Sequence, residues 1–414
     1  MRAFISIPWR LLLLGTILAA LGSGTASPDT QIPLSGATTR THHHHHHQVD
    51  AAILAALAKH PDPVDALVSL HPERAGHLAQ PRLLRILDEN KTTWMTEGDK
   101  VRLKRKGKKF ADLTDHEEFI RANQMNTMAG EAHLPKLSHH GIVRPLLHRV
   151  STTRLRRDLE KLTSFYTRYF GSEDGERSAL WLHDQIAEVR TSSPFAVIAP
   201  SSMRPSGFHE LLFFPLLPAP GADDDGSGTV SILEAFRVLA ASGFVPLHGP
   251  VEFHWYAAEE GGMLGSQAIA RDKKESGARI GAMIEFDMTA FVARNATESI
   301  GFIETQADAP LTKWASDLAN EYLSIPAQIY KLPGGAGSDY MSYNSLGYPA
   351  AFASEGNPSV GGFPGEFDPY VHTEWDTIDI NDKTGTFSIE HMARFSELAI
   401  AFVIEQAGWD RKWR

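Results

Sequence analysis

The sequence predicts an α/β fold with a mixed, largely parallel central sheet that is covered by helices on both faces. Segments typical of strands and of amphipathic helices alternate from Phe110 onward. The 414 residues are 42% hydrophobic and 22% charged, which is the composition of a globular protein with a sizeable core. Acidic residues and a histidine follow the predicted strands, and such sheets bind ligands at the carboxyl ends of their strands.

Charge is unevenly distributed along the chain. Residues 1–109 hold 15 of the 40 Lys+Arg and 9 of the 50 Asp+Glu, which leaves 25 basic and 41 acidic residues, a net charge of −16, in residues 110–414. An acidic body without a basic stripe argues against nucleic acid as the main ligand. The composition suits an enzyme or a binding module, and we expect a monomer.

Residues 1–26 are predicted to be a secretory signal peptide. Arg2 and Arg10 precede and flank the apolar run Leu11–Leu21, and small residues follow up to Ala26, where we expect cleavage. A buried N-terminal helix is the alternative. The run is too short to span a bilayer, which takes about 20 residues. We therefore expect a secreted, extracellular protein with no membrane partner.

Export fits two other features of the sequence. Cysteine is absent, so disulfides are excluded, and stability must come from the core, a bound metal or both. Asn90 and Asn295 each begin an acceptor triplet for N-glycosylation, and we predict a glycoprotein.

Residues 27–109 are predicted to be a propeptide, which would make the chain a zymogen. His42–His47 is either a metal-catching tract or a purification tag. Lys100–Lys109 carries seven basic residues in ten. In an exported chain this run favours a processing region before a mature enzyme, and a solvated face is the alternative.

Helices and strands follow from the spacing of apolar residues. In residues 27–109, helical spacing marks Val49–Lys59, Val64–Leu70 and Pro81–Leu87. In residues 110–414, helices fit Arg154–Phe170, Ser178–Glu188, Gly228–Ala241, Leu311–Tyr322 and Phe387–Gln406. Strands fit Val251–Tyr256, Gly281–Phe286 and Tyr348–Ala353. This alternation predicts one α/β domain over residues 110–414.

Residues suited to metal chemistry gather where the predicted strands end. Glu259 and Glu260 are adjacent, and Asp223–Asp225 lies in a glycine-lined turn before a helix. Asp287 follows another strand, and His372 lies in a loop among carboxylates. A solvated turn would explain each acidic group by itself. Together, Asp, Glu and His at successive strand ends match the nitrogen and oxygen ligands of zinc in a hydrolase.

The residue types also suggest a division of roles. Adjacent residues near a strand end point in different directions, so one glutamate can bind a metal while its neighbour moves a proton. Three aspartates exceed what a helix N-cap requires, since one suffices. A divalent cation would offset their repulsion.

Five motifs carry a resemblance to a known family. They are APGADDDGSGT (219–229), WYAAEEGGMLGSQAIA (255–270), IEFDMTAF (284–291), AGSDYMSY (336–343) and DPYVHTEWDT (368–377). The chain resembles the secreted di-zinc leucine aminopeptidases of fungi, within the co-catalytic zinc aminopeptidases. The resemblance is loose over 110–190 and close over 215–414. It implies a phosphorylase/hydrolase-like zinc aminopeptidase catalytic domain that acts on peptides with a free N-terminus and prefers leucine and similar apolar residues.

The resemblance also implies roles for individual residues. Asp224 would bridge two Zn²⁺ ions, Glu260 and His372 would complete the first site, and Asp287 would belong to the second. Glu259 would be the general base that takes a proton from the attacking water and passes it to the leaving amine.

Supporting roles are implied for two further parts of the chain. Asp376 would orient His372, and the loop Gly337–Tyr343 would help to shape the pocket for the N-terminal side chain.

The chain departs from the family at one place. The second zinc site should also have a histidine in a Gly-Ala-His-x-Asp-Ser motif before the Asp224 turn, and that motif is absent. His209 is the nearest candidate, but Leu211 stands where an orienting aspartate is expected. Codons can be chosen for Met203–Leu212 such that a reading frame shifted by one base encodes His-Gln-Asp-Ser. A frame or splicing error in the gene sequence is therefore one hypothesis.

Three alternatives to a competent di-zinc aminopeptidase remain open. One is an impaired member of the family, because of the missing motif. Another is a single-zinc enzyme similar to glutaminyl cyclases, which would need Asp224, Glu260 and His372 but not the lost histidine. The third is a non-catalytic binding ectodomain on the same fold, against which Glu259 argues, since a binding module has no use for a base beside a metal.

Overall fold

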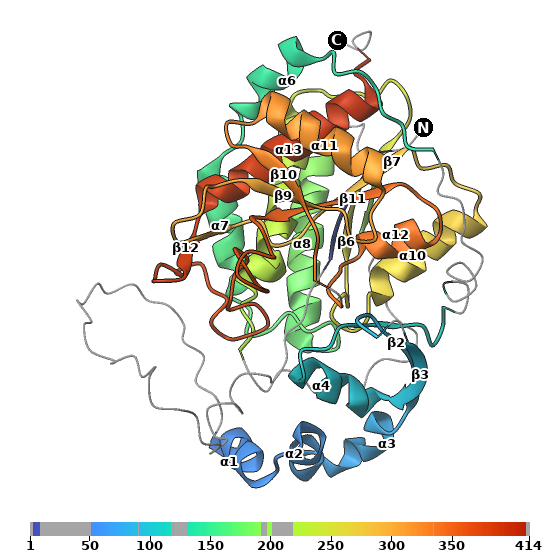
Figure 1. The fold of residues 1–414 in the computed structure, drawn as a ribbon, viewed down its shortest axis with the longest axis vertical. Helices are drawn as coiled ribbons and strands as arrows, with labels where there is room; N and C mark the ends of the chain where they lie inside the picture. Colours follow the sequence, from blue (N-terminus) through green and yellow to red (C-terminus); the bar gives the residue numbers. More distant parts are fainter. Residues whose placement is uncertain are drawn as a thin grey trace.

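A computed structural model gives the fold (Figure 1) and describes residues 3–8, 51–89, 91–116, 119, 131–191, 197–200, 218–333 and 335–410. Its centre is a seven-stranded sheet in the order β10-β9-β11-β7-β1-β6-β5. The strands are β1 (Ala3–Pro8), β5 (Val197–Pro200), β6 (Val251–Tyr256), β7 (Ala282–Phe286), β9 (Ile300–Ile303), β10 (Ala327–Tyr330) and β11 (Ala350–Glu355). Neighbouring strands are parallel except for the antiparallel pair β11–β9. The predicted mixed, largely parallel sheet is confirmed.

Helices cover both faces of this sheet (Figure 1). One face packs against α6 (His140–Leu147), α7 (Thr152–Thr163), α8 (Glu173–Thr191), α9 (Gly228–Ala241), α11 (Ala309–Tyr322) and α13 (Ile389–Ala407). The other packs against α10 (Leu264–Glu275) and α12 (Tyr340–Ser345). Successive residues of β6 serve the two cores, with Trp255 in the first and Tyr256 in the second. Burial on both faces fixes the positions of the strand ends.

Most predicted helices and strands of the body are confirmed, with ends that differ by up to five residues. Arg154–Phe170 is corrected: α7 ends at Thr163 with Ser164 as its C-cap, and residues 164–170 are not helical.

The region before the body holds one correction. Pro81–Leu87 is not a helix: Pro81–Ile86 forms β2, between β3 (Lys91–Thr96) and β4 (Phe110–Asp112). Alternate residues Leu84 and Ile86 are buried. Seven residues are too few for apolar spacing to separate a strand from a helix, and strand pairing decided the outcome.

The N-terminal region is a small unit beside the body. It contains α1 (Ala51–Lys59), α2 (Pro63–Leu70), η1 (Pro72–Arg74), α3 (Ala75–Leu78) and α4 (Glu97–Arg105). Its apolar clusters are small, one around Leu67 and Val101 and one around Leu84 and Phe110. Because β4 pairs with β2, this sheet crosses the predicted boundary at residues 109/110.

The strand β1 comes from the predicted signal peptide. Ala3–Pro8 lies in the middle of the sheet, parallel to β6 through six residue pairs and to β7 through four. This part of the chain therefore contributes to the central sheet of the unprocessed protein.

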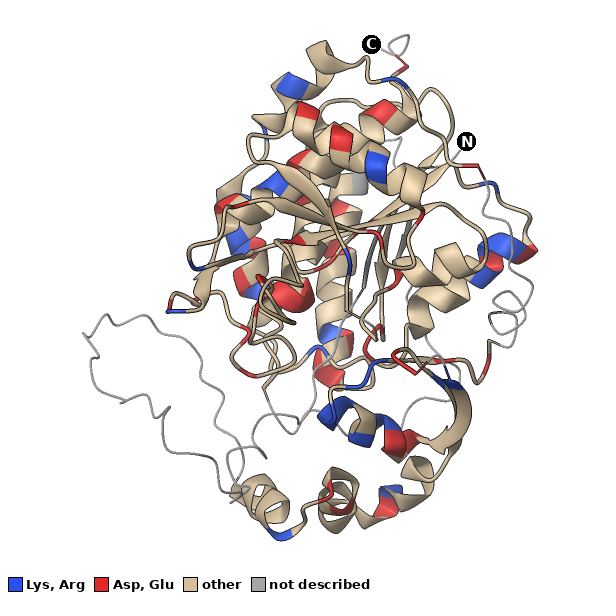
Figure 2. Cartoon of the chain, viewed as in Figure 1, with Lys and Arg blue, Asp and Glu red and all other residues tan. Residues whose placement is uncertain are grey.

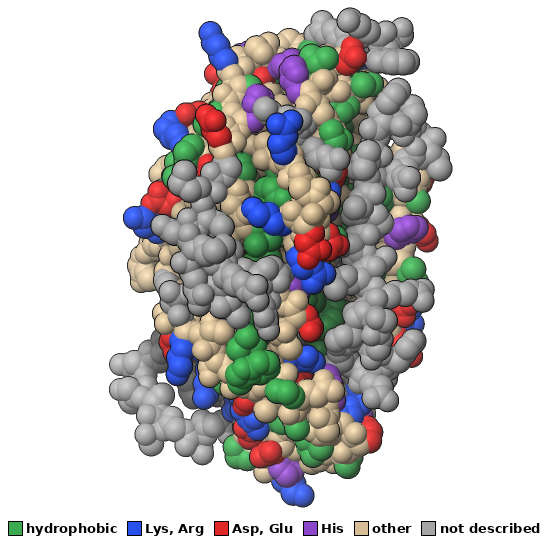
Figure 3. All heavy atoms as spheres, turned by 90° about the vertical axis from the view of Figure 1, so that its right-hand side faces the viewer, with side chains coloured by type: hydrophobic (Ala, Val, Ile, Leu, Met, Phe, Trp, Pro, Cys, Tyr) green, Lys and Arg blue, Asp and Glu red, His purple; other side chains and the backbone are tan. Residues whose placement is uncertain are grey.

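Charged side chains of both signs lie together on the face of the molecule seen in Figure 3, among the residues that the structure describes. In Figure 2, helix α4, with its Lys and Arg positions in blue, lies below the sheet. In the described part of the chain, no helix is long and apolar enough to cross a membrane.

Candidate active site

The loop before α9 carries Asp224 and is held from two sides. The Arg168 guanidinium, only 4% exposed, donates to the carbonyls of Pro220 and Gly221, at 2.6 Å for Gly221. On the other side, Asp376 accepts from the backbone N–H groups of Asp223 at 2.7 Å and Asp224 at 3.0 Å. The backbone that carries Asp224 is thus fixed before any ligand binds.

Glycine is required at one point of this loop. Gly221 has φ +51°, and a Cβ there would lie 2.6 Å from both the Arg168 guanidinium and the Asp224 carbonyl oxygen. A side chain would therefore clash and impose an unfavourable backbone conformation.

Two of the three aspartates serve the loop itself. Asp223 accepts from the N–H of Ala290 at 2.8 Å, and Asp225 accepts from Gly228 at 3.0 Å and from Met288 at 3.3 Å. These bonds connect the loop to α9 and to the segment after β7. Asp224 is the aspartate whose carboxylate faces the other candidate ligands.

Three of the predicted metal ligands lie together. Asp224, Glu260 and His372 each place one ligand atom within 4.8 Å of the other two. His372 Nε2 lies 2.6 Å from Glu260 Oε1 and 3.1 Å from Asp224 Oδ2. Both carboxylates are buried, while the His372 side chain is 33% exposed. Two carboxylates and one imidazole are a donor set that suits zinc.

Glu259 and Asp287 lie nearby in the fold but outside this group of three. Glu259 is buried in the turn after β6, where Ala258 has φ +61° and the Glu259 carbonyl accepts from Gly262. Asp287 is fully buried directly after β7. Both occupy carboxyl ends of strands, as predicted. Their roles as base and second-site ligand stay predictions.

Two lysines of the N-terminal region reach the same group. Lys104 Nζ is paired with Glu260 Oε2, and Lys109 Nζ lies 3.1 Å from Glu260 Oε1 and 3.3 Å from His372 Nε2. Their side chains are 9% and 17% exposed. The sequence indicated the basic run but gave no sign of where it binds.

The local charges favour a neutral imidazole. Desolvation of the ring, followed by the positive charge of Lys109, lowers the pKa of His372 to about 4, although Asp224 opposes the shift. A neutral imidazole is the form that binds metals.

A set of buried carboxyl groups behind the site was missed by sequence reasoning. Glu355, at the end of β11, accepts from the N–H groups of Phe291 and Asp368 at 2.7 Å each. Burial and the nearby Asp223 raise the pKa of Glu355 and raise that of Asp368 to about 8. The position of Glu355 at a strand end was the available signal. These groups connect the loops that carry Asp224 and His372.

Asp376 has different partners from the one predicted. Its two carboxylate oxygens support the Asp224 loop, and burial raises its pKa. We therefore assign it the positioning of Asp224, while an effect on His372 stays a prediction.

The remaining predicted positions have mixed outcomes. In Gly337–Tyr343, the Ser338 hydroxyl donates to Glu285, at the end of β7, at 2.6 Å. Asn295 is exposed, as glycosylation requires. His209 and Asn90 lie outside the described residues.

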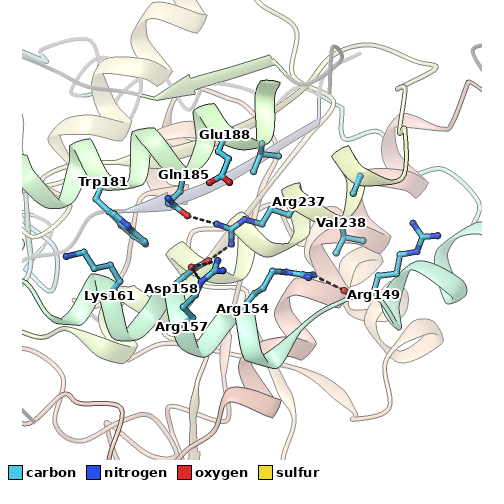
Figure 4. Close-up of a pocket in the computed structure, with 12 residues that line it drawn as sticks. Arg149, Arg154, Arg157, Asp158, Lys161, Trp181, Gln185, Glu188, Arg237 and Val238 are labelled. Carbon is cyan, nitrogen blue, oxygen red and sulfur yellow. Dashed lines mark hydrogen bonds and ion pairs between the residues drawn. The ribbon is translucent and has the colours of Figure 1, made fainter. Parts of the chain in front are cut away.

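A surface cavity lies away from this site. It has a volume of about 990 Å³ and lies between α7, α8 and α9 (Figure 4). Three of its four arginines have acidic partners: Arg154 pairs with Glu234, and Arg157 and Arg237 pair with Asp158. None of the three grouped ligands lines it, so it is not the candidate active site.

Known proteins resemble this chain in sequence and in fold. A sequence profile described as peptidase family M28 matches residues 208–396. Leucine aminopeptidase 1 of Grosmannia clavigera is 38% identical over 82% of this chain and 88% of its own. Leucine aminopeptidase 1 of Aspergillus fumigatus is 36% identical over 80% of this chain and 90% of its own. The crystal structure of Legionella pneumophila LapA aminopeptidase has a TM-score of 0.62 at 24% identity, and the match covers 80% of this chain and 96% of that one.

The fold and the site define a peptidase of the α/β class. The chain belongs to peptidase family M28, together with the fungal leucine aminopeptidases that it resembles. The resemblance seen in the five motifs is confirmed.

Proposed function

We propose that the protein is an exported metalloaminopeptidase that removes N-terminal residues from peptides and prefers leucine and similar apolar side chains. The observation that carries the proposal is the group formed by Asp224, Glu260 and His372 at the strand ends, with Glu259 next to Glu260 in the chain. The relatives named leucine aminopeptidase 1 support the preference.

The donor set fits a divalent metal, and zinc is the ion we propose. Asp224, Glu260 and His372 would hold it, with Asp287 available for a second ion. When bound, the metal would polarise the scissile carbonyl and lower the pKa of an adjacent water.

The chain's own residues account for the proton transfers. Glu259 would accept a proton from the attacking water and deliver it to the leaving amine. Its burial, at 4% exposed, keeps that carboxylate away from bulk solvent. Arg168 and Asp376 would keep Asp224 in place during turnover.

Glu259→Gln tests the proposed base. Hydrolysis of a leucine chromogenic amide should fall by about 10²–10⁴-fold, because the variant keeps the shape of the side chain but cannot accept the proton. Zinc content, measured on the same preparation, should stay unchanged. Unchanged hydrolysis would remove Glu259 from the mechanism. Chelation of zinc should abolish wild-type activity, and readdition should restore it.

A single-metal enzyme is the second candidate function. The three grouped ligands are those that such an enzyme would need, and they form one compact group in the described part of the chain. Formation of pyroglutamate from a peptide with N-terminal glutamine, with one zinc ion per chain and no leucine amide hydrolysis, would favour this candidate.

Export, glycosylation at Asn295 and a monomeric state complete the proposal. The leader pattern supports export, but cleavage near Ala26 would remove β1 from between β6 and β7. The exported form would then need another strand at this position. N-terminal sequencing of the secreted protein tests the cleavage. A transcript sequence through residues 192–212 tests the hypothesis of an error in the gene sequence.

A further inference from the structure

We propose that Lys104 and Lys109 act as an internal cation in the metal site of the unprocessed chain, so that metal binding requires the basic segment to leave. This inference rests on the proposed metallopeptidase function and extends it to regulation: processing would control metal loading as well as substrate access.

The lysines contact atoms that a metal would need. Between them they contact both Glu260 oxygens, and Lys109 Nζ also lies 3.3 Å from His372 Nε2. Zinc ligands lie about 2.0–2.2 Å from the ion. An ion bound to both Glu260 Oε1 and His372 Nε2 would lie within about 5 Å of the Lys109 ammonium. The two positive charges would repel at that distance in a buried site, so the lysine and the metal disfavour each other.

The lysine pair and a divalent metal ion would bring equal charge to the site. Two ammonium groups carry the same formal charge as one divalent ion, and each faces the buried carboxylate of Glu260. The side chain of Glu260 is only 1% exposed, so leaving its charge without a cation would be costly. The lysines therefore stabilise the same charged groups that a bound metal would stabilise.

Local structure directs both lysines to one point. A capping box at Thr96 and Asp99 fixes the start of α4, and Lys104 lies near its end. The chain then turns at Gly107, with φ +67°, where the Gly107 N–H donates to the Lys104 carbonyl at 2.8 Å. Lys109 follows directly before β4. The turn brings the two side chains to Glu260 from its two sides.

The other basic residues of Lys100–Lys109 behave differently. They pair with groups of the N-terminal unit or its boundary strand, or they are exposed: Lys100 with Glu97 and Asp112, Arg102 with Asp62 and Asp99, Arg105 with the Pro61 carbonyl, Lys108 with Asp88 and Glu89, and Lys106 at the surface. A run that served only as a protease recognition sequence would not require two of its lysines to contact Glu260.

The test compares two double variants of the full chain. Lys104→Gln/Lys109→Gln removes the cations at Glu260. Lys106→Gln/Lys108→Gln makes the same charge change in the same run without touching the site. Zinc affinity, measured by competition with a chromophoric chelator, should rise by at least about tenfold in the first variant, or about 1.4 kcal/mol, and by less than about twofold in the control. Equal affinities in the wild type and both variants would overturn the inference.

A second measurement uses the wild-type chain, so it does not depend on the folding of a variant. Added zinc should displace the segment and speed its cleavage within residues 97–112 by a protease of broad specificity. Cleavage at the same rate with and without zinc would contradict the inference. A processed chain that fails to hydrolyse leucine amides while these zinc effects hold would overturn the proposed function alone.

Discussion

Two segments from the first 109 residues reach the body, and they are held in different ways. Ala3–Pro8 lies inside the central sheet and pairs through its backbone with β6 and β7. Lys100–Lys109 lies at the strand ends, and Lys104 and Lys109 contact the active site through their side-chain charges. The first contact adds a strand to the sheet, whereas the second places two ammonium groups against the candidate metal ligands at the strand ends.

The two kinds of contact suggest two kinds of role: Ala3–Pro8 is part of the structure of the sheet, whereas Lys100–Lys109 can be released from the site. Removing a central strand leaves the N–H and C=O groups of both neighbouring strands without hydrogen-bond partners. Each such group that stays buried costs about 1–3 kcal/mol. Removing an ammonium group from a carboxylate can be offset by another cation, and a metal is one. The backbone-held segment should therefore control stability, while the charge-held segment should control access and metal binding.

The largest expected effect comes from breaking the backbone-held segment. In the unprocessed chain, Ile5 is paired with Phe253 of β6 and Ile284 of β7. Ile5→Pro removes a backbone N–H from the middle of the sheet, and we expect a loss of about 5 kcal/mol in the free energy of unfolding. Urea unfolding measures it.

Ile5→Val is the control for this prediction, since it keeps the N–H group and should cost no more than about 1.5 kcal/mol. If Ile5→Pro unfolds at the same urea concentration as wild type, β1 does not hold the sheet together. The chain without residues 1–26 would then fold as well as the full chain.

The next largest effect concerns the attachment of the N-terminal unit. Lys100 is buried and pairs with Asp112 and with Glu97, the latter at 3.1 Å. Lys100→Met leaves the buried Asp112 charge without this partner, which should cost about 4 kcal/mol locally.

Hydrogen exchange can locate that loss. Protection should fall in β2, β3 and β4 and stay unchanged in β6 and β7. The exposed Lys106→Met should change stability by less than about 0.5 kcal/mol. Equal loss of protection in β6 would mean that the N-terminal unit and the body unfold together, and that the segment is not separable.

The smallest effect lies within the body, on the strand next to β1. Burial alone would raise the pKa of Glu252, but hydrogen bonds from His254 and Lys273 outweigh it and lower the pKa from 4.5 to about 2. A lowered acid pKa adds stability that is present above about pH 4.5 and is lost as the pH falls toward 2. Solvent screening reduces this contribution, which we expect to be about 1–2 kcal/mol at neutral pH.

Glu252→Gln should therefore be less stable than wild type near pH 7, and the difference should shrink as the pH falls through this window. Urea unfolding of both proteins at several pH values measures the difference. A difference that stays constant with pH would show that Glu252 contributes through packing and not through its charge.

The sequence by itself determined the class of fold and most of the chemistry. Apolar patterns located β6 and α9 to the residue. For α9 the 14-residue helical period has few alternatives, and for β6 the aromatic and β-branched residues favoured a strand. Acidic residues and a histidine near strand ends predicted a metal site at one edge of the sheet, since parallel strands end at one edge. The family resemblance then singled out Asp224, Glu260 and His372, and the structure brings these three together.

Only the tertiary structure decided which segments, far apart in the sequence, pair to complete the two sheets. Pro81–Ile86 is a strand because β3 and β4 pair with it, and Ala3–Pro8 is a strand because β6 and β7 do. Local pattern cannot reveal such pairing, because its stabilisation comes from partners far away in the sequence. The contacts of Lys104, Lys109 and Asp376 could not be predicted for the same reason. The sequence shows that these residues are charged but not which charge or backbone group each one contacts.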